Sequence, residues 1–260
     1  MTWIIGHILA VGIGLSLGLI GGGGSILAVP ILVYVMGLEA KVAIAMSLAV
    51  VGIVSLIGVI PHWRQGNVNF KTAAIFTPAA MLGAFLGARL AALPFITGTI
   101  QLICFGIVMV LASVLMIRSS SPKAPNQEPT VEHQSPVPHS HQRQWIAIPL
   151  EGLGVGILTG FVGVGGGFAI IPALVLLGDL PMKEAIGTSL LIIAFKSAAG
   201  FAGYLNQVTL DWTLMLTFTL AASFGTVAGA LLTQRIEAKY LQKGFGYFVL
   251  IVAIFILIKR

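Results

Sequence analysis

Two glycine-rich segments lie at matching places in two apolar halves of this chain. The first reads Gly18-Leu-Ile-Gly-Gly-Gly-Gly-Ser25, and the second, 142 positions later, reads Gly160-Phe-Val-Gly-Val-Gly-Gly-Gly167. Further pairs at the same offset, without a gap, are Gly12/Gly154, Gly14/Gly156, Pro30/Pro172, Lys41/Lys183, Ser47/Ser189, Leu48/Leu190, Gln65/Gln207, Gly83/Gly225 and Gly87/Gly229. An internal duplication with the same interrupted hydrophobic segment in each half is typical of secondary transporters.

The composition places the chain in a membrane. Hydrophobic residues make up 57% of it and charged residues 8%, whereas a soluble domain carries about 25% charged residues. This number of charged residues is too small to cover a surface that faces water. The solvent of this chain is therefore lipid. With about 20 residues per span, the 260 residues leave room for about eight membrane segments.

Several functional classes find no support in the sequence. The net charge of +6 comes from scattered cations, with no basic stripe that would indicate a nucleic-acid partner. Cys104 is the single cysteine, so no disulfide frame or thiolate metal site is expected. No nucleotide fingerprint, paired membrane carboxylates or Ser/His/Asp arrangement is present. We therefore expect no enzyme activity, no cofactor and no metal.

The apolar runs predict an all-α polytopic protein with two tandem repeats, residues 1–117 and 145–260. The runs cover residues 3–36, 42–61, 72–91, 95–117, 145–177, 184–205, 212–234 and 241–258. Between the repeats, residues 118–144 hold five prolines and almost no aliphatic residues, which predicts a disordered aqueous linker. Three histidines fall in this linker, where a metal-binding tract is the alternative to a solvated tether.

The first and fifth runs are too long for one straight crossing. Each exceeds 30 residues, which is about 50 Å of helix against a hydrocarbon core of about 30 Å. A glycine in a helix costs about 1 kcal/mol relative to alanine, so the glycine cluster predicts two shorter helices joined at a break. The alternative is that the glycines only permit close helix packing, which suits Gly14, Gly18, Gly156 and Gly160.

The loop charges favour inverted repeats. If each long run crosses the membrane once, thirteen loop and terminal cations divide 7 to 6 between the two sides. If each long run enters and returns as a hairpin, they divide 9 to 4, with Arg64, Lys71, Arg118, Lys123, Arg143, Lys183, Arg235, Lys239 and Lys243 on the richer side. Only the second case shows the bias toward a positive cytoplasmic side. It places both termini outside and the linker in the cytoplasm.

A helix that begins inside the membrane exposes unpaired N–H groups and the positive end of its dipole, which suit an anion. The two glycine segments would present such N-termini without side chains, and inversion would bring them together near the midplane. The predicted backbone anion site consists of Gly21, Gly22, Gly23, Gly24, Ser25, Gly163, Gly165, Gly166 and Gly167.

Lys196 is the one charged residue deep in a predicted span, and an intramembrane cation is a functional candidate by default. It follows Ser189 by seven residues and so shares its helix face. Thr188, Ser189 and, in the first half, Ser47 are predicted hydroxyl donors to the same anion. The alternatives are that Lys196 extends to an interface or pairs with a carbonyl, and that the Ser47 hydroxyl bonds to its own helix backbone.

The paired Gly-x-x-Gly-x-Gly-Gly segments, each followed by Ile/Val-Pro and by Ser-Leu in the next helix, resemble the TauE/SafE sulfite-exporter family, also called the toluene-sulfonate uptake permease family. The resemblance implies a multi-pass inner (plasma) membrane transporter of sulfur-containing anions such as sulfite, sulfonates or sulfoacetate-like compounds. An anion channel and a non-transporting scaffold or assembly factor are the competing interpretations. The coupling ion (proton or sodium) and the oligomeric state stay open.

Overall fold

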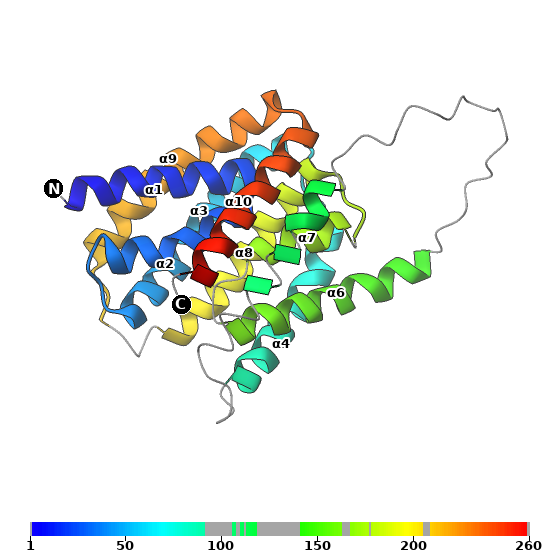
Figure 1. Ribbon diagram of the computed structural model, residues 1–260, viewed down its shortest axis with the longest axis horizontal. Coiled ribbons are helices and arrows are strands. Elements are labelled where there is room, and N and C mark those ends of the chain that lie inside the picture. Colours follow the sequence, from blue (N-terminus) through cyan, green and yellow to red (C-terminus); the bar gives the residue numbers. More distant parts are fainter. Residues whose placement is uncertain are drawn as a thin grey trace.

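The computed structural model describes residues 2–91, 106–107, 110–111, 113–118, 141–162, 167–176, 178–204 and 209–258. Over these residues the fold is a helical bundle without strands, which confirms the predicted all-α class (Figure 1). The elements are α1 (Thr2–Ile20), η1 (Gly22–Gly24), α2 (Ser25–Tyr34), α3 (Ala40–Arg64), α4 (Phe70–Ala91), α6 (His141–Val162), α7 (Gly167–Leu176), α8 (Met182–Tyr204), α9 (Trp212–Arg235) and α10 (Ala238–Ile258).

Five of the described helices are long and apolar enough to cross a membrane. They are the segments Thr2–Ile20, Val42–Arg64, Phe70–Gly87, Met182–Ala202 and Trp212–Arg235. Large apolar side chains cover much of the outer surface, among them Leu82 and Phe224, which are 64% and 72% exposed. Such a surface is stable in lipid, so the chain is a multi-pass membrane protein.

The helix boundaries recur at the offset seen in the sequence. α1 ends at Ile20 and α6 at Val162; α2 covers Ser25–Tyr34 and α7 covers Gly167–Leu176. α6 begins at His141, ahead of the predicted start at residue 145 and inside the predicted linker. The predicted run 95–117 and the linker lie mostly outside the described residues.

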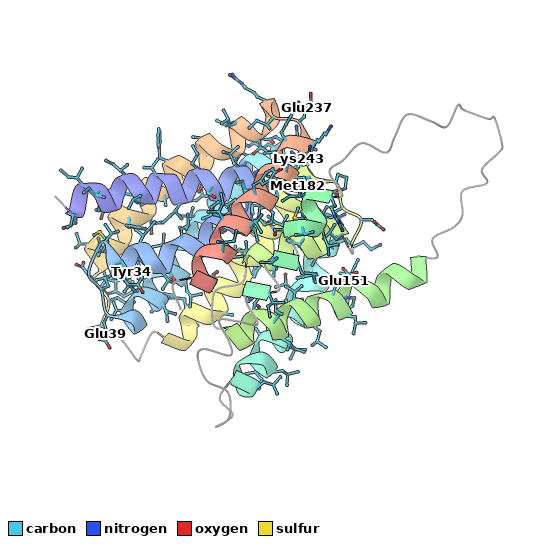
Figure 2. All side chains as sticks on the ribbon, in the orientation of Figure 1. Tyr34, Glu39, Glu151, Met182, Glu237 and Lys243 are labelled. Atoms are coloured by element: carbon cyan, nitrogen blue, oxygen red, sulfur yellow. The ribbon has the colours of Figure 1, made fainter. Side chains whose placement is uncertain are left out.

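The first long run is broken where the sequence predicted. α1 ends at Ile20, and α2 then runs back along it, because Gly24 lies against Ile13 and Leu17 while Met36 lies against Gly6. α1 and α2 therefore form an antiparallel hairpin. Figure 2 shows Tyr34, the last residue of α2, at the end of the molecule where the N-terminus lies in Figure 1.

The helices pair across the two halves. α1 packs on α9 from the second half, α6 packs on α4 from the first, and α3 packs on α8. The pairs α1–α9 and α4–α6 thus flank a central α3–α8 pair. Val50 and Val54 of α3 and Leu190 and Ile193 of α8 are fully or almost fully buried at this centre.

Backbone contact explains why the paired helices carry glycine. A Cβ at Gly14 of α1 would collide with the carbonyl oxygen of Ala222, and a Cβ at Gly156 of α6 would collide with that of Ala80. These two contacts are equivalent at the 142-residue offset. The packing role considered for Gly14 and Gly156 in the sequence is therefore the one they have, as small residues allow helix backbones to touch.

Candidate functional site

The break between α1 and η1 depends on Gly21. Its backbone has φ 68° and ψ −124°, a conformation open to glycine at little cost. Its N–H donates to the Leu17 carbonyl (2.7 Å), which closes the last turn of α1. A Cβ at this position would lie 2.6 Å from Ser189 Oγ and 2.8 Å from Ile171 Cδ1. Backbone conformation and crowding both require glycine here.

Side chains from two other helices satisfy the broken end of α1. Because the chain turns at Gly21, the carbonyl of Gly18 lacks the usual helical donor four residues ahead. It accepts instead from Nε2 of His62 (3.0 Å) and from Oγ1 of Thr233 (3.1 Å), whose single proton is shared with the Gly229 carbonyl (3.0 Å). A carbonyl oxygen only accepts, so Nε2 of His62 carries the proton. Both side chains are completely buried.

His62 is a buried structural residue beside the break, and the sequence did not reveal this position. A histidine near a predicted helix end is most commonly an interfacial residue, yet this one is inside the bundle and supports the break. Its other ring nitrogen, Nδ1, is buried without a hydrogen-bond partner. It shares the last turn of α3 with Arg64, so its position in the sequence did not separate it from an interfacial residue.

The second half forms the surroundings of this break. Ile171 of α7 and Ser189 of α8 lie against Gly21, and the ring of Phe248 in α10 would lie 3.2 Å from a Cβ at Gly23. Residues Gly21–Ser25 are all buried. We call Gly21–Ser25, together with Ile171 and Ser189, the break site.

Backbone amides are the donors that the break site offers. No side chain caps the start of η1 or of α2, so their first N–H groups have no side-chain acceptor. The hydroxyls of Ser25, Ser47 and Ser189 each donate to the carbonyl three residues earlier, at 2.7, 2.8 and 2.8 Å. The alternative predicted for Ser47, a bond to its own helix backbone, is thus the one present, and Ser25 and Ser189 make the same kind of bond.

Thr188 points to another part of the fold. Its Oγ1 accepts from the backbone N–H of Asn69 (2.9 Å), and the Asn69 amide donates to Glu184 (3.2 Å). These bonds hold the loop between α3 and α4 against the first turns of α8. Thr188 therefore belongs to a loop contact rather than to the break site.

Lys196 and Ser189 share a helix but have different neighbours. Nζ of Lys196 donates to Oγ1 of Thr159 in α6 (2.6 Å). The side chain also lines a cavity of ≈ 370 Å³ between α4 and α8, together with Leu48, Met81, Ala84, Phe85, Ser197, Ala199 and Gly200. Seven residues along a helix amount to a rise of about 10 Å, so Lys196 lies well away from Gly21.

The structure thus brings together Gly21 and Ser189 but separates Thr188 and Lys196 from them. The predicted site residues Gly163, Gly165 and Gly166 lie outside the described residues, and Gly167 begins α7 at the position equivalent to Ser25. Within the described part of the chain, His, Cys, Asp and Glu nowhere gather in threes as metal ligands would.

A multi-pass helical bundle with a glycine-broken hairpin buried between its halves defines a membrane protein of the transporter class. The chain belongs to the sulfite exporter TauE/SafE family, whose model matches residues 7–256. The family predicted from the glycine segments is therefore confirmed, as is a multi-pass protein of a bacterial-type membrane.

Relatives match this chain over most of their length. A probable membrane transporter protein of Xylella fastidiosa is 36% identical over 94% of this chain and 91% of its own. The probable membrane transporter protein YunE of Bacillus subtilis is 28% identical over 92% and 91%. The probable membrane transporter protein MJ0441 of Methanocaldococcus jannaschii is 26% identical over 88% and 86%. No solved structure matches the chain significantly.

Proposed function

We propose that this protein is a secondary transporter of sulfur-containing anions, namely sulfite, sulfonates or sulfoacetate-like compounds. The family name supports the substrate class, and the relatives' names support transport. The break site supports an anion, because it offers backbone N–H groups without neighbouring carboxylate side chains among its own residues.

The observation that carries this proposal is the contact between the break of the first half and the second half. η1 packs against α7, and Gly21 lies beside Ser189 of α8. The start of α2 is thereby directed into the bundle rather than toward lipid. An oxyanion there would be stabilised by backbone amides and by the positive end of the helix dipole.

The second glycine segment supplies the matching half of the site. α7 starts at Gly167, at the offset of 142 from Ser25, and has the same length of 10 residues as α2. We infer that residues Gly163–Gly167 present a second set of amides toward the same anion. We propose that Lys196 assists at this second segment, because Thr159, which accepts from its Nζ, lies near the C-terminal end of α6, just before the segment.

The same pairing supports the proposal of inverted repeats and alternating access. The contacts of α1 with α9 correspond to those of α6 with α4, and α1 and α2 form a hairpin, as the 9-to-4 charge distribution requires. We propose that the α1–α9 and α4–α6 pairs rock against the central α3–α8 pair, so that the bound anion faces each side in turn.

Transport by purified protein in liposomes tests this function. Uptake of labelled sulfite, sulfate, taurine and sulfoacetate is measured with and without proton or sodium gradients. We expect saturable uptake and counterflow of at least one sulfur-containing anion. Gly23→Val should abolish it, because the added side chain enters the break site toward Phe248. Gly12→Val is the matched control, because no atom lies within 4 Å of a Cβ at Gly12.

The competing interpretations give different results in the same preparation. An anion channel would conduct continuously without saturable counterflow. A scaffold or assembly factor would transport none of the anions, and its partner binding would be indifferent to Gly23→Val. Normal transport by Gly23→Val would show that the anion binds elsewhere.

A further inference from the structure

An amphipathic groove runs along the outside of the α3–α9 contact. It has a volume of ≈ 410 Å³, and its walls are formed by Ile57, Ile60, Pro61, Val227 and Leu231, while Arg64, Gln65 and Gln234 lie at one end. Residues 57, 60, 61 and 64 share one face of α3, and 227, 231 and 234 share one face of α9. One end of the groove is therefore polar, and the rest is apolar.

A second cavity continues the groove at this polar end. It measures ≈ 390 Å³, shares Leu231 and Gln234 with the groove, and adds Arg235. Nζ of Lys183 donates to the Gln234 carbonyl (3.4 Å), so a third cation lies nearby. Arg64 and Arg235 are exposed, and within the described part of the chain neither is ion-paired.

We propose that this groove binds one anionic phospholipid, with an acyl chain between α3 and α9 and the phosphate group at Arg64 and Arg235. The apolar walls suit a hydrocarbon chain, since Ile60 and Leu231 are 47% and 53% exposed in a membrane-facing position. Two unpaired arginines at the mouth supply the charge complementary to a phosphodiester, which guanidinium groups bind with paired N–H donors.

The position of the groove in the bundle agrees with this occupant. Arg64 and Arg235 both belong to the cation-rich side that the charge distribution assigns to the cytoplasm, the leaflet where anionic lipids concentrate. Figure 2 shows Lys243 and Glu237 at the end of the molecule away from Tyr34 and Glu39. In the sequence, Arg235, Lys239 and Lys243 outnumber the carboxylate of Glu237 where α9 gives way to α10.

The bound lipid would reinforce the contact that supports the break. Gln65 at the mouth donates to the Ala230 carbonyl of α9 (3.3 Å). His62 and Thr233, which cap α1, stand on the same two helices within one turn of the groove residues. The lipid site rests on α3 and α9 alone and does not depend on which anion the protein carries.

Native mass spectrometry of the full chain, with phosphatidylglycerol and phosphatidylcholine of identical acyl chains, tests this proposal. We expect wild type to retain one phosphatidylglycerol in preference to phosphatidylcholine. The double variant Arg64→Gln, Arg235→Gln should bind phosphatidylglycerol about 30-fold more weakly. Leu231→Trp, which fills the groove, should lose the lipid as well. Arg118→Gln is the control. This substitution also removes a positive charge, but Arg118 lines neither cavity.

Three results would overturn the proposal. Equal retention of both lipids by wild type would reduce the groove to ordinary lipid contact. Unchanged phosphatidylglycerol affinity in the double variant would remove the arginines from the site. Displacement of the lipid by millimolar inorganic phosphate would show that the mouth binds a free anion and that the apolar walls contribute nothing. All variants are exposed changes, and their folding is verified by thermal unfolding.

Discussion

Gly14→Ala, at the centre of the α1–α9 contact, tests directly whether the backbones of these two helices touch. The new methyl group would collide with the carbonyl oxygen of Ala222 and lie 2.7 Å from its carbonyl carbon and 2.9 Å from the Thr226 nitrogen. These are backbone atoms of α9, so no side-chain rotation relieves the overlap, and the two helices must separate.

The expected cost can be assembled from three terms. Overpacking of this kind costs about 1–3 kcal/mol. Separating the helices also lengthens the hydrogen bond from Thr226 Oγ1 to the Gly14 carbonyl (2.9 Å), which contributes about 1 kcal/mol. The better helix propensity of alanine returns about 1 kcal/mol. Gly14→Ala should therefore lower the free energy of unfolding by about 1–3 kcal/mol.

Gly12→Ala, two residues earlier in α1, is expected not to lower the free energy of unfolding. Gly12 lies in the same helix, and no atom lies within 4 Å of a Cβ placed there. Gly12→Ala should therefore be neutral or should stabilise by up to about 1 kcal/mol. The second half of the chain offers the same comparison independently. A Cβ at Gly156 would collide with the backbone of Ala80, whereas no atom lies within 4 Å of a Cβ at Gly154.

Reversible unfolding in mixed micelles measures all four variants against wild type. The prediction requires Gly14→Ala and Gly156→Ala to fall below Gly12→Ala and Gly154→Ala. If Gly14→Ala were as stable as Gly12→Ala, α1 and α9 would not be in backbone contact, and the exchange of helices between the halves would lose its main support.

Three further predictions concern the site and the topology. His62→Leu leaves the Gly18 carbonyl with one donor and should cost about 1–3 kcal/mol, whereas His62→Gln retains an N–H donor and should recover most of that loss in the same unfolding measurement; equal stability of the two variants would contradict the capping role. Lys196→Met should weaken anion binding by about 10- to 100-fold, the contribution of a charge-assisted hydrogen bond, measured by calorimetry; wild-type affinity would reduce Lys196 to a structural residue. A cysteine at Ser120 should be labelled from the cytoplasmic side only, and both termini from outside; labelling of the termini from the cytoplasm would reverse the orientation.

Part of the candidate site was accessible from the sequence, because local backbone preferences determine it. Four consecutive glycines do not continue a helix, and the chain does turn at Gly21 with a positive φ. The contact of Ser189 with Gly21 was not predicted, because the sequence placed Ser189 only on the helix face of Lys196. His62 and Thr233 were not foreseen, because they act on a carbonyl more than 40 residues away in the sequence.

For Lys196, helical periodicity predicted the helix face correctly but not the neighbouring residues. A spacing of seven places Lys196 and Ser189 on one face of α8, but that face passes different neighbours at different heights. Ser189 lies against the break of the first half, while Lys196 lies beside Thr159 of α6 and the cavity toward α4. The sequence specifies the face of a helix, and the neighbouring helices determine what each turn of that face touches.

The sequence alone determined the membrane environment, the helical class, the break at Gly21 and the family, because hydropathy, glycine's backbone freedom and motif spacing are properties of short segments. Only the tertiary structure decided that α1 pairs with α9 and α6 with α4, that His62 and Thr233 cap the broken end of α1, and that Thr188 binds a loop. Those outcomes depend on which backbones can approach closely enough to touch, and the glycine spacing in a helix indicates close packing without specifying the partner helix.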